Sequence, residues 1–275
     1  MLPITDDHMH LNMKAGRGME AIKEFRNAGG THVLIVSLPA GELGLSIERG
    51  EDFRAVFDAT VEAVQRANEL VKAYAVVGVH PAEYAGLAGA MGMEKAYAIV
   101  REGLEIAAKY VAEGKAVAVK SGRPHYPVSP ELWETSNELM RYAMDLCVEE
   151  GCAIQLHTES EPGTMQSISD IAKQARMEPH KVIKHFSPPL VKECESLNVF
   201  PSVICSRGAL EEALSQGTRF MMETDYIDDP DRPGAVLGPK TVPRKTKEAI
   251  RNGVPVETFY KIHKDTPEKA NGITN

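Results

Sequence analysis

Short apolar, β-branched runs alternate along the chain with longer stretches whose apolar residues recur at three- and four-residue intervals. Such short runs are typical of buried strands, and the longer stretches are typical of amphipathic helices. Strands are expected at residues 2–9, 31–37, 71–79, 116–120, 152–157, 181–185, 199–205 and 219–223. Helices are expected around residues 19–28, 51–70, 94–113, 131–150, 163–176, 189–196, 208–215, 241–252 and 255–264.

This alternation predicts a parallel sheet whose strands are joined by right-handed helical crossovers. Eight such units in about 250 residues favour closure of the sheet into a barrel. No Gly-x-Gly-x-x-Gly motif follows the first predicted strand, which argues against a dinucleotide-binding fold. No proline-rich or low-complexity linker separates the units. We therefore expect an α/β chain that forms a single (β/α)8 TIM barrel over residues 1–275.

The composition limits the classes of partner. The chain has 31 Lys and Arg against 39 Asp and Glu, a formal net charge of −8, which argues against coating nucleic acid by bulk charge. No apolar run is long enough to span a membrane, and the first residues lack the basic and apolar regions of a signal peptide. We expect a cytoplasmic protein without a membrane partner, and we leave its oligomeric state open. The cysteines are expected to be buried free thiols: Cys147, Cys152, Cys194 and Cys205.

Four histidines and one aspartate fall at the ends of predicted strands. His8 and His10 end the first strand, His157 and His185 end the fifth and sixth, and Asp225 follows the eighth. In a barrel, the carboxyl ends of all strands open onto one face, so these side chains are expected to converge. The two-residue spacing also directs His8 and His10 to the same side of their strand. Nitrogen and carboxylate donors without thiolate predict a site for zinc, manganese, nickel or iron that keeps a position open for water.

The ordered set of strand-end residues resembles the amidohydrolase superfamily. Within it, the chain is most similar to the TatD-related metal-dependent hydrolases of archaeal type. Besides the histidines, the resemblance rests on the Gly-Val-His-Pro segment at 78–81 and the Glu-Thr-Asp segment at 223–225. The segments 122–128 and 222–230 support it, and it extends from Asp6 to the tail at 267–271.

The resemblance implies a binuclear centre. One metal would be held by His8, His10 and Asp225, and the other by His157 and His185, with a bridging carboxylate after the fourth strand. This chain departs from the pattern there, because Lys120 stands where the TatD group usually has glutamate. Either Lys120 reacts with carbon dioxide to form a carbamate, as in the phosphotriesterase-like branch, or it stays an ammonium group and leaves a mononuclear or impaired site.

The predicted chemistry is hydrolysis by a metal-activated water, with Asp225 as general base. The metals would be one or two divalent ions, with zinc as first choice and manganese, nickel, iron or magnesium as alternatives. Candidate substrate-binding residues on the same face are His80, Arg123, His125, Tyr126, Arg207 and Arg232. The arginines favour a small anionic substrate or a nucleic-acid end, although each has the alternative of a solvated position or a salt bridge to Asp228, Asp229 or Asp231.

Three functions remain open. The first, which the sequence favours, is a TatD-like deoxyribonuclease or phosphodiesterase acting on phosphate ester bonds. The second is a phosphotriesterase-like hydrolase of small esters, lactones or amides, which a carbamylated Lys120 would support. The third is a metal-binding barrel without catalytic activity. Retention of the complete histidine and aspartate set argues against the third.

Overall fold

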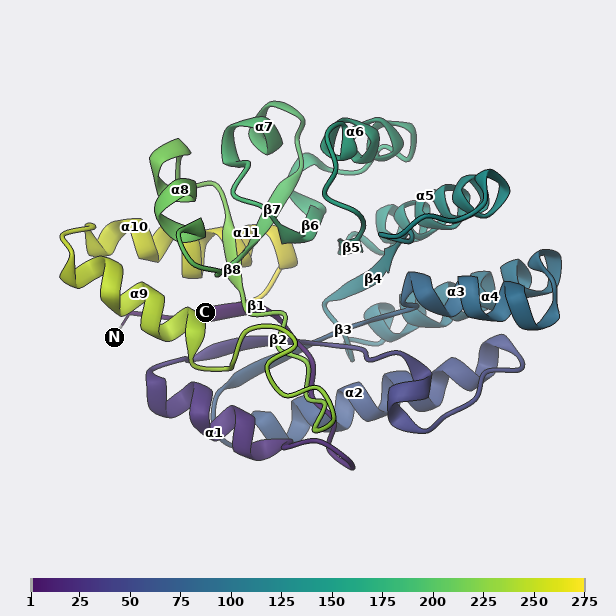
Figure 1. Cartoon of the computed structure of the whole chain (residues 1–275), viewed down its shortest axis with the longest axis horizontal. Helices are drawn as coiled ribbons and strands as arrows, with labels where there is room; N and C mark the ends of the chain where they lie inside the picture. The colour runs from purple at the N-terminus through teal and green to yellow at the C-terminus, as the bar shows by residue number, and fades with distance from the viewer. Residues whose placement is uncertain (1, 275) are drawn as a thin grey trace.

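A computed structural model describes residues 2–274 and contains one eight-stranded parallel sheet in the order β1 to β8. Helices surround the strands on the outside, which gives a (β/α)8 barrel and confirms the predicted fold (Figure 1). The strands are β1 (Thr5–Met9), β2 (His32–Val36), β3 (Lys72–Gly78), β4 (Ala118–Gly122), β5 (Ala153–His157), β6 (Val182–Ser187), β7 (Phe200–Ile204) and β8 (Met221–Glu223).

The helices follow the strands in the expected alternation. They are α1 (Met19–Ala28), α2 (Phe53–Ala67), α3 (Pro81–Met91), α4 (Met93–Ala112), α5 (Pro130–Glu150), α6 (Thr164–Gln174), α7 (Val191–Ser196), α8 (Ala209–Gln216), α9 (Thr241–Arg251), α10 (Val256–Tyr260) and α11 (Thr266–Asn271). Short 3-10 turns occupy Ala40–Leu43, Gly50–Asp52 and Pro179–Lys181, and a π-helical turn spans Lys261–Asp265.

The structure corrects several of the predicted boundaries. Lys120 and His185 do not end their strands, because β4 continues to Gly122 and β6 to Ser187. The helix α3 was not predicted, since its Ala- and Gly-rich sequence has no helical period of apolar and polar positions. The predicted helix at 255–264 is α10 followed by the π-helical turn, and the helical segment continues through α11.

The barrel interior is layered by the two-residue period of the strands. One apolar cluster includes Ala118, Ala153, Ile183, Phe200 and Met221, each from a different strand. Two residues further along the same strands stand the buried polar side chains Lys120, Gln155, His185, Ser202 and Glu223. Because side chains two apart on a strand share a face, this polar layer lies above the apolar one, toward the carboxyl ends of the strands.

Two irregularities in strand pairing coincide with predicted ligands. The register between β1 and β2 shifts between Asp6 and Met9, around His8. The register between β6 and β7 shifts between Lys184 and Ser187, around His185. Such bulges re-aim side chains next to functional sites. The barrel closes just beyond β8, where the Asp225 amide donates to His8 O at 3.0 Å and the His10 amide donates to Tyr226 O at 2.8 Å.

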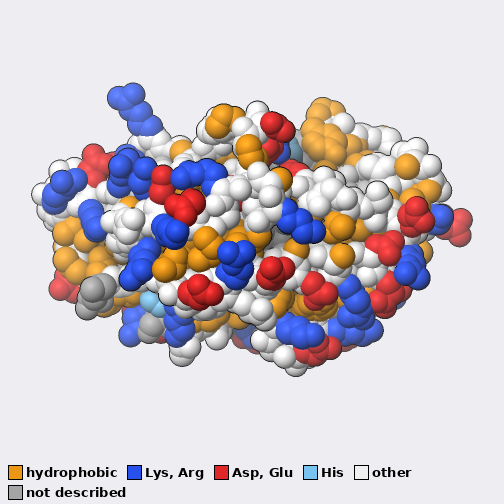
Figure 2. Space-filling view, turned by 90° about the horizontal axis from the view of Figure 1, so that it is seen from below, with side chains coloured by type: hydrophobic (Ala, Val, Ile, Leu, Met, Phe, Trp, Pro, Cys, Tyr) orange, Lys and Arg blue, Asp and Glu red, His pale blue; other side chains and the backbone are white. Residues whose placement is uncertain are grey.

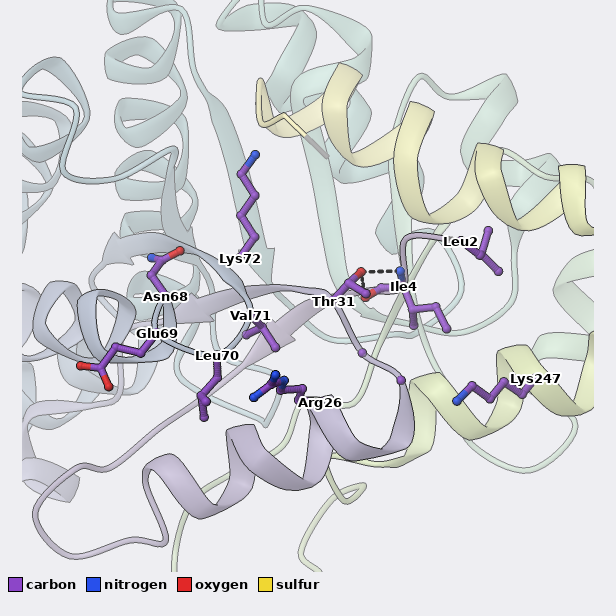
Figure 3. A pocket seen from close by; sticks show the side chains of 12 residues that line it. Leu2, Ile4, Arg26, Thr31, Asn68, Glu69, Leu70, Val71, Lys72 and Lys247 are labelled. Atoms are coloured by element: carbon purple, nitrogen blue, oxygen red, sulfur yellow. Dashed lines mark hydrogen bonds between the residues drawn. The ribbon is translucent and has the colours of Figure 1, made fainter.

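A cavity at the amino ends of the strands has no histidine among the described residues that line it. It measures about 970 Å³ and is lined by residues at the amino ends of the first strands, among them Ile4, Thr31 and Lys72 (Figure 3). Lys247 beside it donates to Ala28 O at the carboxyl end of α1, which is a helix-capping contact.

The mixed charges on the surface and the burial of the cysteines are what the composition predicts. Acidic, basic and apolar side chains are interspersed over the face in Figure 2. None of the helices within residues 2–274 is both long enough and apolar enough to span a membrane. All four cysteines are buried free thiols, as predicted.

Candidate metal centre

His8, His10 and Asp225 bring three donor atoms together at the carboxyl end of the barrel. The Nε2 atoms of His8 and His10 lie 3.3 Å apart. Oδ1 of Asp225 lies 3.8 Å from the first and 3.6 Å from the second. A tetrahedral ion with bonds near 2.1 Å separates its ligands by about 3.4 Å, so these three atoms fit one divalent metal.

Hydrogen bonds on the far side of each imidazole fix which nitrogen faces this cluster. His8 Nδ1 donates to Gln155 Oε1 at 2.8 Å, and His10 Nδ1 donates to Val36 O at 2.8 Å. The amide of Gln155 is itself oriented, because its Nε2 donates to Asp7 O at 3.1 Å. Both Nε2 atoms therefore present lone pairs to the cluster, as metal-binding histidines with oriented partners do.

Burial keeps these imidazoles neutral. It lowers the pKa of both His8 and His10 well below the ordinary value, and the nearby Lys120 ammonium lowers it further. Two neutral lone pairs and a carboxylate facing one another within 4 Å repel, and a bound cation converts that repulsion into coordination. The donor set therefore fits a divalent metal.

His157 and His185 form an adjoining pair. His157 Nδ1 lies 3.0 Å from His185 Nε2. The other nitrogen of each ring has its own partner, since His157 Nε2 contacts His125 Nδ1 at 2.8 Å and His185 Nδ1 contacts Glu223 Oε1 at 3.1 Å. The inward pair Nδ1 and Nε2 is thus the pair available for a second ion.

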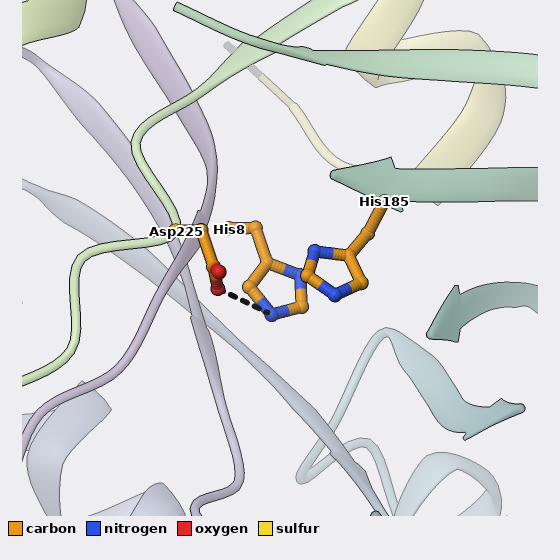
Figure 4. Close-up of side chains that lie close together, drawn as sticks. All are labelled: His8, His185 and Asp225. Carbon is orange, nitrogen blue, oxygen red and sulfur yellow. Dashed lines mark ion pairs between the residues drawn. The ribbon is translucent and has the colours of Figure 1, made fainter. Parts of the chain in front are cut away.

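The two sets are in contact rather than separate. The rings of His8 and His185 stack with centroids 3.8 Å apart. One donor atom from each of His8, His185 and Asp225 lies within 4.8 Å of the others (Figure 4). All of the predicted ligands except Lys120 therefore belong to one continuous cluster of nitrogen and carboxylate donors.

The amine of Lys120 reaches this cluster from β4. Its side chain is buried, with 1% of the residue exposed, and Nζ lies 3.4 Å from His8 Nε2. Burial lowers the pKa of its amine to about 8, against the opposing effect of Asp225 and Glu223. A neutral amine is thus accessible near neutral pH at this position.

A cavity of about 470 Å³ opens onto the cluster. Of the predicted substrate-binding residues, His80, His125 and Arg232 line it, together with the predicted ligands His10, Lys120, His157 and Asp225. His80 also caps α3 through Nδ1, which accepts from the Ala82 amide at 3.2 Å. Its ring lies 4.4 Å from that of His157.

Arg123 was predicted to bind substrate, but it does not line the cavity. It is buried, and its guanidinium forms a two-pronged ion pair with Glu159, with Nε to Oε2 at 2.9 Å. Nη1 donates to Asn137 and Ser167, and the guanidinium lies 4.5 Å from the ring centroid of Trp133. Its donors are committed to the protein, so Arg123 orients Glu159 at the cavity instead of binding an anion.

Tyr126 and Arg207 do not line the cavity either. Tyr126 is exposed beside His125, with ring centroids 5.4 Å apart, and Arg207 is exposed in the loop after β7. Arg232 lines the cavity but is paired with Asp229 at 2.5 Å and with Glu42 at 3.1 Å. The anion-binding group of arginines expected from the sequence is therefore not assembled.

Several residues of the site were missed by sequence reasoning. Gln155 and Glu223 each precede a predicted ligand by two positions, so the two-residue strand period was a signal that could have found them. Lys184 is buried, and Nζ donates to Thr158 O at 3.1 Å and His185 O at 2.7 Å. Glu42, in the 3-10 turn at Ala40–Leu43, and Glu159 and Glu161, in the loop after β5, line the cavity from positions that carry no periodic signal.

Comparisons with known proteins agree on the family and the fold. Residues 5–271 match the family model of the TatD related DNases. An uncharacterized protein of Methanocaldococcus jannaschii, MJ1127, is 41% identical over 275 residues, covering 98% of this chain and 95% of that protein.

Solved structures of similar fold include a TatD homolog and lactonases. The TatD homolog YjjV of Escherichia coli K12 has a TM-score of 0.68 at 18% identity and covers 98% of both chains. A mutant PTE-like lactonase of Deinococcus radiodurans has a TM-score of 0.65 at 16% identity, covering 99% of this chain and 96% of the other. The lactonase Lmo2620 of Listeria monocytogenes has a TM-score of 0.65 at 15% identity, with coverage of 98% and 94%.

Proposed function

Because the chain belongs to the TatD-related DNase family, we propose that it is a metal-dependent hydrolase with a binuclear centre bridged by a carbamylated Lys120. We further propose that its substrates are small uncharged esters or lactones. The observation that supports the centre most strongly is the position of Lys120, buried on the floor of the donor cluster and 3.4 Å from His8.

The carbamate follows from the chemistry of a buried amine. The lone pair of a neutral Lys120 Nζ attacks the carbon of carbon dioxide, so a C–N bond forms while one C–O π bond breaks and its electron pair moves to oxygen. One proton then leaves Nζ to water. The product carries a negative charge on two oxygens, which is what a bridge between two dications needs. The lowered pKa of about 8 makes the neutral amine available for this reaction.

The residues that would hold the metals are His8, His10 and Asp225 for one ion and His157 and His185 for the other, with zinc as the proposed identity. Divalent ions bound to such donors lower the pKa of water toward about 7 and polarise carbonyl or phosphoryl oxygens.

Asp225 orients the attacking water and accepts its proton. Its carboxylate lies at the boundary between the donor cluster and the cavity, where it is both a predicted ligand and a lining residue. Burial raises the pKa of this carboxyl to about 6, against the opposing effect of Lys120 and Lys184.

The size and charge of the cavity support a small uncharged substrate. A volume of about 470 Å³ is typical of small-molecule sites. Its lining carboxylates are Glu42, Glu159, Glu161 and Asp225, of which Glu42 is paired with Arg232 and Glu159 with the buried Arg123. Away from the metal ions, the one arginine among the described lining residues is therefore already paired, and the lining offers little positive charge to a long chain of phosphates.

Hydrolysis of a phosphodiester at a nucleic-acid end is the second candidate. Membership of a family described as DNases favours it. His80 and His125 line the cavity next to the ligands and offer donors to a single phosphate. A single phosphate at a strand end would lie close to few of the lining carboxylates Glu42, Glu159 and Glu161.

A substrate panel tests the choice between these candidates. The purified protein, with its metal content measured by elemental analysis, should turn over simple lactones and p-nitrophenyl esters in a chelator-sensitive manner. Turnover of bis(p-nitrophenyl) phosphate or DNA oligonucleotides should be at least about 10-fold slower in kcat/KM. A reversed order would replace the ester assignment by the phosphodiester one, and no chelator-sensitive turnover of either class would remove the hydrolase proposal.

Labelled carbon dioxide tests the bridge directly. Protein equilibrated with ¹³C-bicarbonate and zinc should show one carbamate resonance by NMR, which Lys120→Ala abolishes. The matched control is Lys184→Met, because Lys184 is equally buried but its Nζ is engaged by two carbonyls. Lys120→Ala should also lose metal and regain part of its turnover with added short carboxylates. A carbamate signal that survives Lys120→Ala would exclude this bridge.

A further inference from the structure

Phe186, the residue after the ligand His185, has an unusual backbone. Its φ is +50°, in the left-handed region that bulky residues rarely adopt. It lies inside the irregular pairing between β6 and β7. Glycine or asparagine occupies such positions at little cost, so the choice of phenylalanine requires a benefit elsewhere.

Burial does not supply that benefit. Phe186 is 42% exposed, and its ring lies 6.2 Å from that of His185, at the wide end of ring-contact distances. The side chain lines the cavity that opens onto the donor cluster. A strained backbone, a bulge and an exposed aromatic ring therefore coincide at the mouth of the site.

The conformation is held from inside the barrel. The Phe186 amide donates to Glu223 Oε1 at 2.8 Å, and the same oxygen contacts His185 Nδ1 at 3.1 Å. Burial and the neighbouring Asp225 raise the pKa of Glu223 well above its ordinary value. One carboxyl oxygen thus fixes both the metal-facing imidazole and the turn that sends the next side chain to the cavity.

Other apolar residues line the same cavity. Leu38 and Pro39 follow β2, and Ile227 follows β8. We call these three residues and Phe186 the apolar rim. Together they offer a surface for a hydrocarbon group, next to polar lining residues that include Glu159 and Glu161.

We propose that Phe186 is a specificity-determining residue that binds the alkyl or acyl chain of an ester or lactone substrate. This proposal rests on the proposed function and narrows its substrate class to esters and lactones with an apolar chain. Each methylene that the rim covers should tighten binding by roughly 2- to 4-fold, as burial of a CH₂ group does.

Lactams provide a test that is independent of turnover, because they resemble lactones but resist hydrolysis. We would measure Kd by calorimetry for γ-lactams with no side chain, a butyl chain or an octyl chain, using the zinc-loaded protein. The octyl lactam should bind at least about 10-fold more tightly than the unsubstituted one. Phe186→Asn should weaken the octyl lactam about 10-fold and reduce the chain-length preference, mainly through KM in the matching lactone assays.

Asparagine tolerates the left-handed conformation, so this variant separates the ring from the backbone. Its Tm should equal that of the unmodified protein or exceed it by up to about 4 °C. Phe186→Gly provides a second variant with the same expectation. Tyr260→Asn is the matched control, since Tyr260 is 37% exposed on α10 and does not line the cavity, and its chain-length preference should not change.

The outcomes separate this inference from the function it rests on. Chain-dependent lactam binding that requires Phe186, without ester or lactone turnover, would support Phe186 as the binding site for an apolar chain and would contradict the ester assignment. Lactone turnover with no chain preference, or the same preference in Phe186→Asn, would overturn the inference and leave the hydrolase intact. A Tm loss above about 4 °C in both variants would assign the ring a structural role instead.

Discussion

Asp225 is held in place by its neighbours on both sides of the barrel seam. Its φ is +46°, and its amide donates to His8 O at 3.0 Å. The preceding Thr224 is fixed by Asp6, whose carboxyl accepts from the Thr224 amide at 3.1 Å and from its hydroxyl at 2.7 Å. The carboxylate of Asp225 is therefore positioned by the backbone of His8 and, through Thr224, by Asp6.

Asp225→Asn should abolish turnover while preserving the fold. Asparagine is among the residues best tolerated at positive φ, so the substitution removes the charge and the base without adding backbone strain. We expect kcat to fall by about 10²- to 10⁴-fold, with Tm of the metal-free protein within a few degrees of the unmodified value. Steady-state kinetics and thermal unfolding in chelator measure the two effects. Unimpaired turnover in this variant would show that Asp225 is not the base.

His263 predicts a pH dependence of stability. It is buried between Thr5 and Thr246, its ring stacks on Phe259, and burial lowers its pKa to about 3. The unfolded chain binds a proton at this residue near pH 6.5, whereas the native chain does not. The free energy of unfolding therefore decreases as pH falls from 6.5 toward 3, by up to about 1.4 kcal/mol per pH unit.

His263→Gln should flatten this slope. Urea unfolding in chelator at pH 7.5, 6.5, 5.5 and 4.5 compares the variant with the unmodified protein, so that contributions of other buried histidines cancel. His180→Gln is the matched control, because His180 is partly exposed beside Glu178 and should change the slope less. Equal slopes in all three proteins would contradict a neutral buried His263.

At the residue scale, the clustering of His8, His10, His157, His185 and Asp225 could be predicted from the sequence, whereas side chains whose donors are already paired could not be recognised. These residues stand out because a side chain able to bind metal lies at or just after each predicted strand end. Arg123 fits the same kind of pattern, yet it is neutralised by Glu159, 36 residues away, and covered by Trp133. Only the tertiary packing reveals such pairing.

Two loops at the mouth of the barrel are joined through one buried carboxylate. Asp228 accepts from the amides of Asn12, Arg17 and Gly18 at 3.1, 2.7 and 2.7 Å. It also accepts from the Tyr226 hydroxyl at 2.8 Å. The loop after β1 is thereby fixed to the loop after β8.

Asp228→Ala should loosen both loops. It leaves three amides without their acceptor, and we expect the free energy of unfolding to fall by about 3 kcal/mol. Gly16→Ala should act in the same direction, because a Cβ there would lie 2.4 Å from the Asp228 carboxyl. Asp231→Ala, in the exposed part of the same loop, is the control and should change stability by less than about 0.5 kcal/mol. Denaturant unfolding measures the stability of all three variants. Equal stability of Asp228→Ala and Asp231→Ala would show that the Asp228 carboxylate does not hold the two loops together.

At the element scale, the eight strands could be predicted because their apolar runs are short and bounded by turn residues. Two strand ends were predicted too early, because β4 continues past Lys120 with Ser and Gly, and β6 continues past His185 with Phe and Ser. Neither pair of residues extends an apolar run. The helix α3 is set by Pro81 at its start and by packing, so its composition alone did not indicate it.

At the scale of the whole molecule, the metal site and the barrel closure share residues. His8 belongs to β1 and Asp225 follows β8, so a metal held by both joins the first and last strands of the barrel. The backbone contact between the same two residues forms the seam. Metal binding is therefore expected to stabilise the entire fold through its closure.

Removal of metal should lower the stability of the barrel, beginning at this seam. An ion present at 1,000 times its Kd contributes about 4 kcal/mol, so chelation should lower Tm by roughly 8–16 °C, and zinc should restore it. Hydrogen exchange should accelerate at amides 8–10 and 224–226 before it does in β3 and β4. His8→Asn serves as the matched variant, since it should already exchange rapidly at the seam and respond little to chelator. Uniform acceleration over all eight strands would mean that the metal stabilises the barrel without acting through its closure.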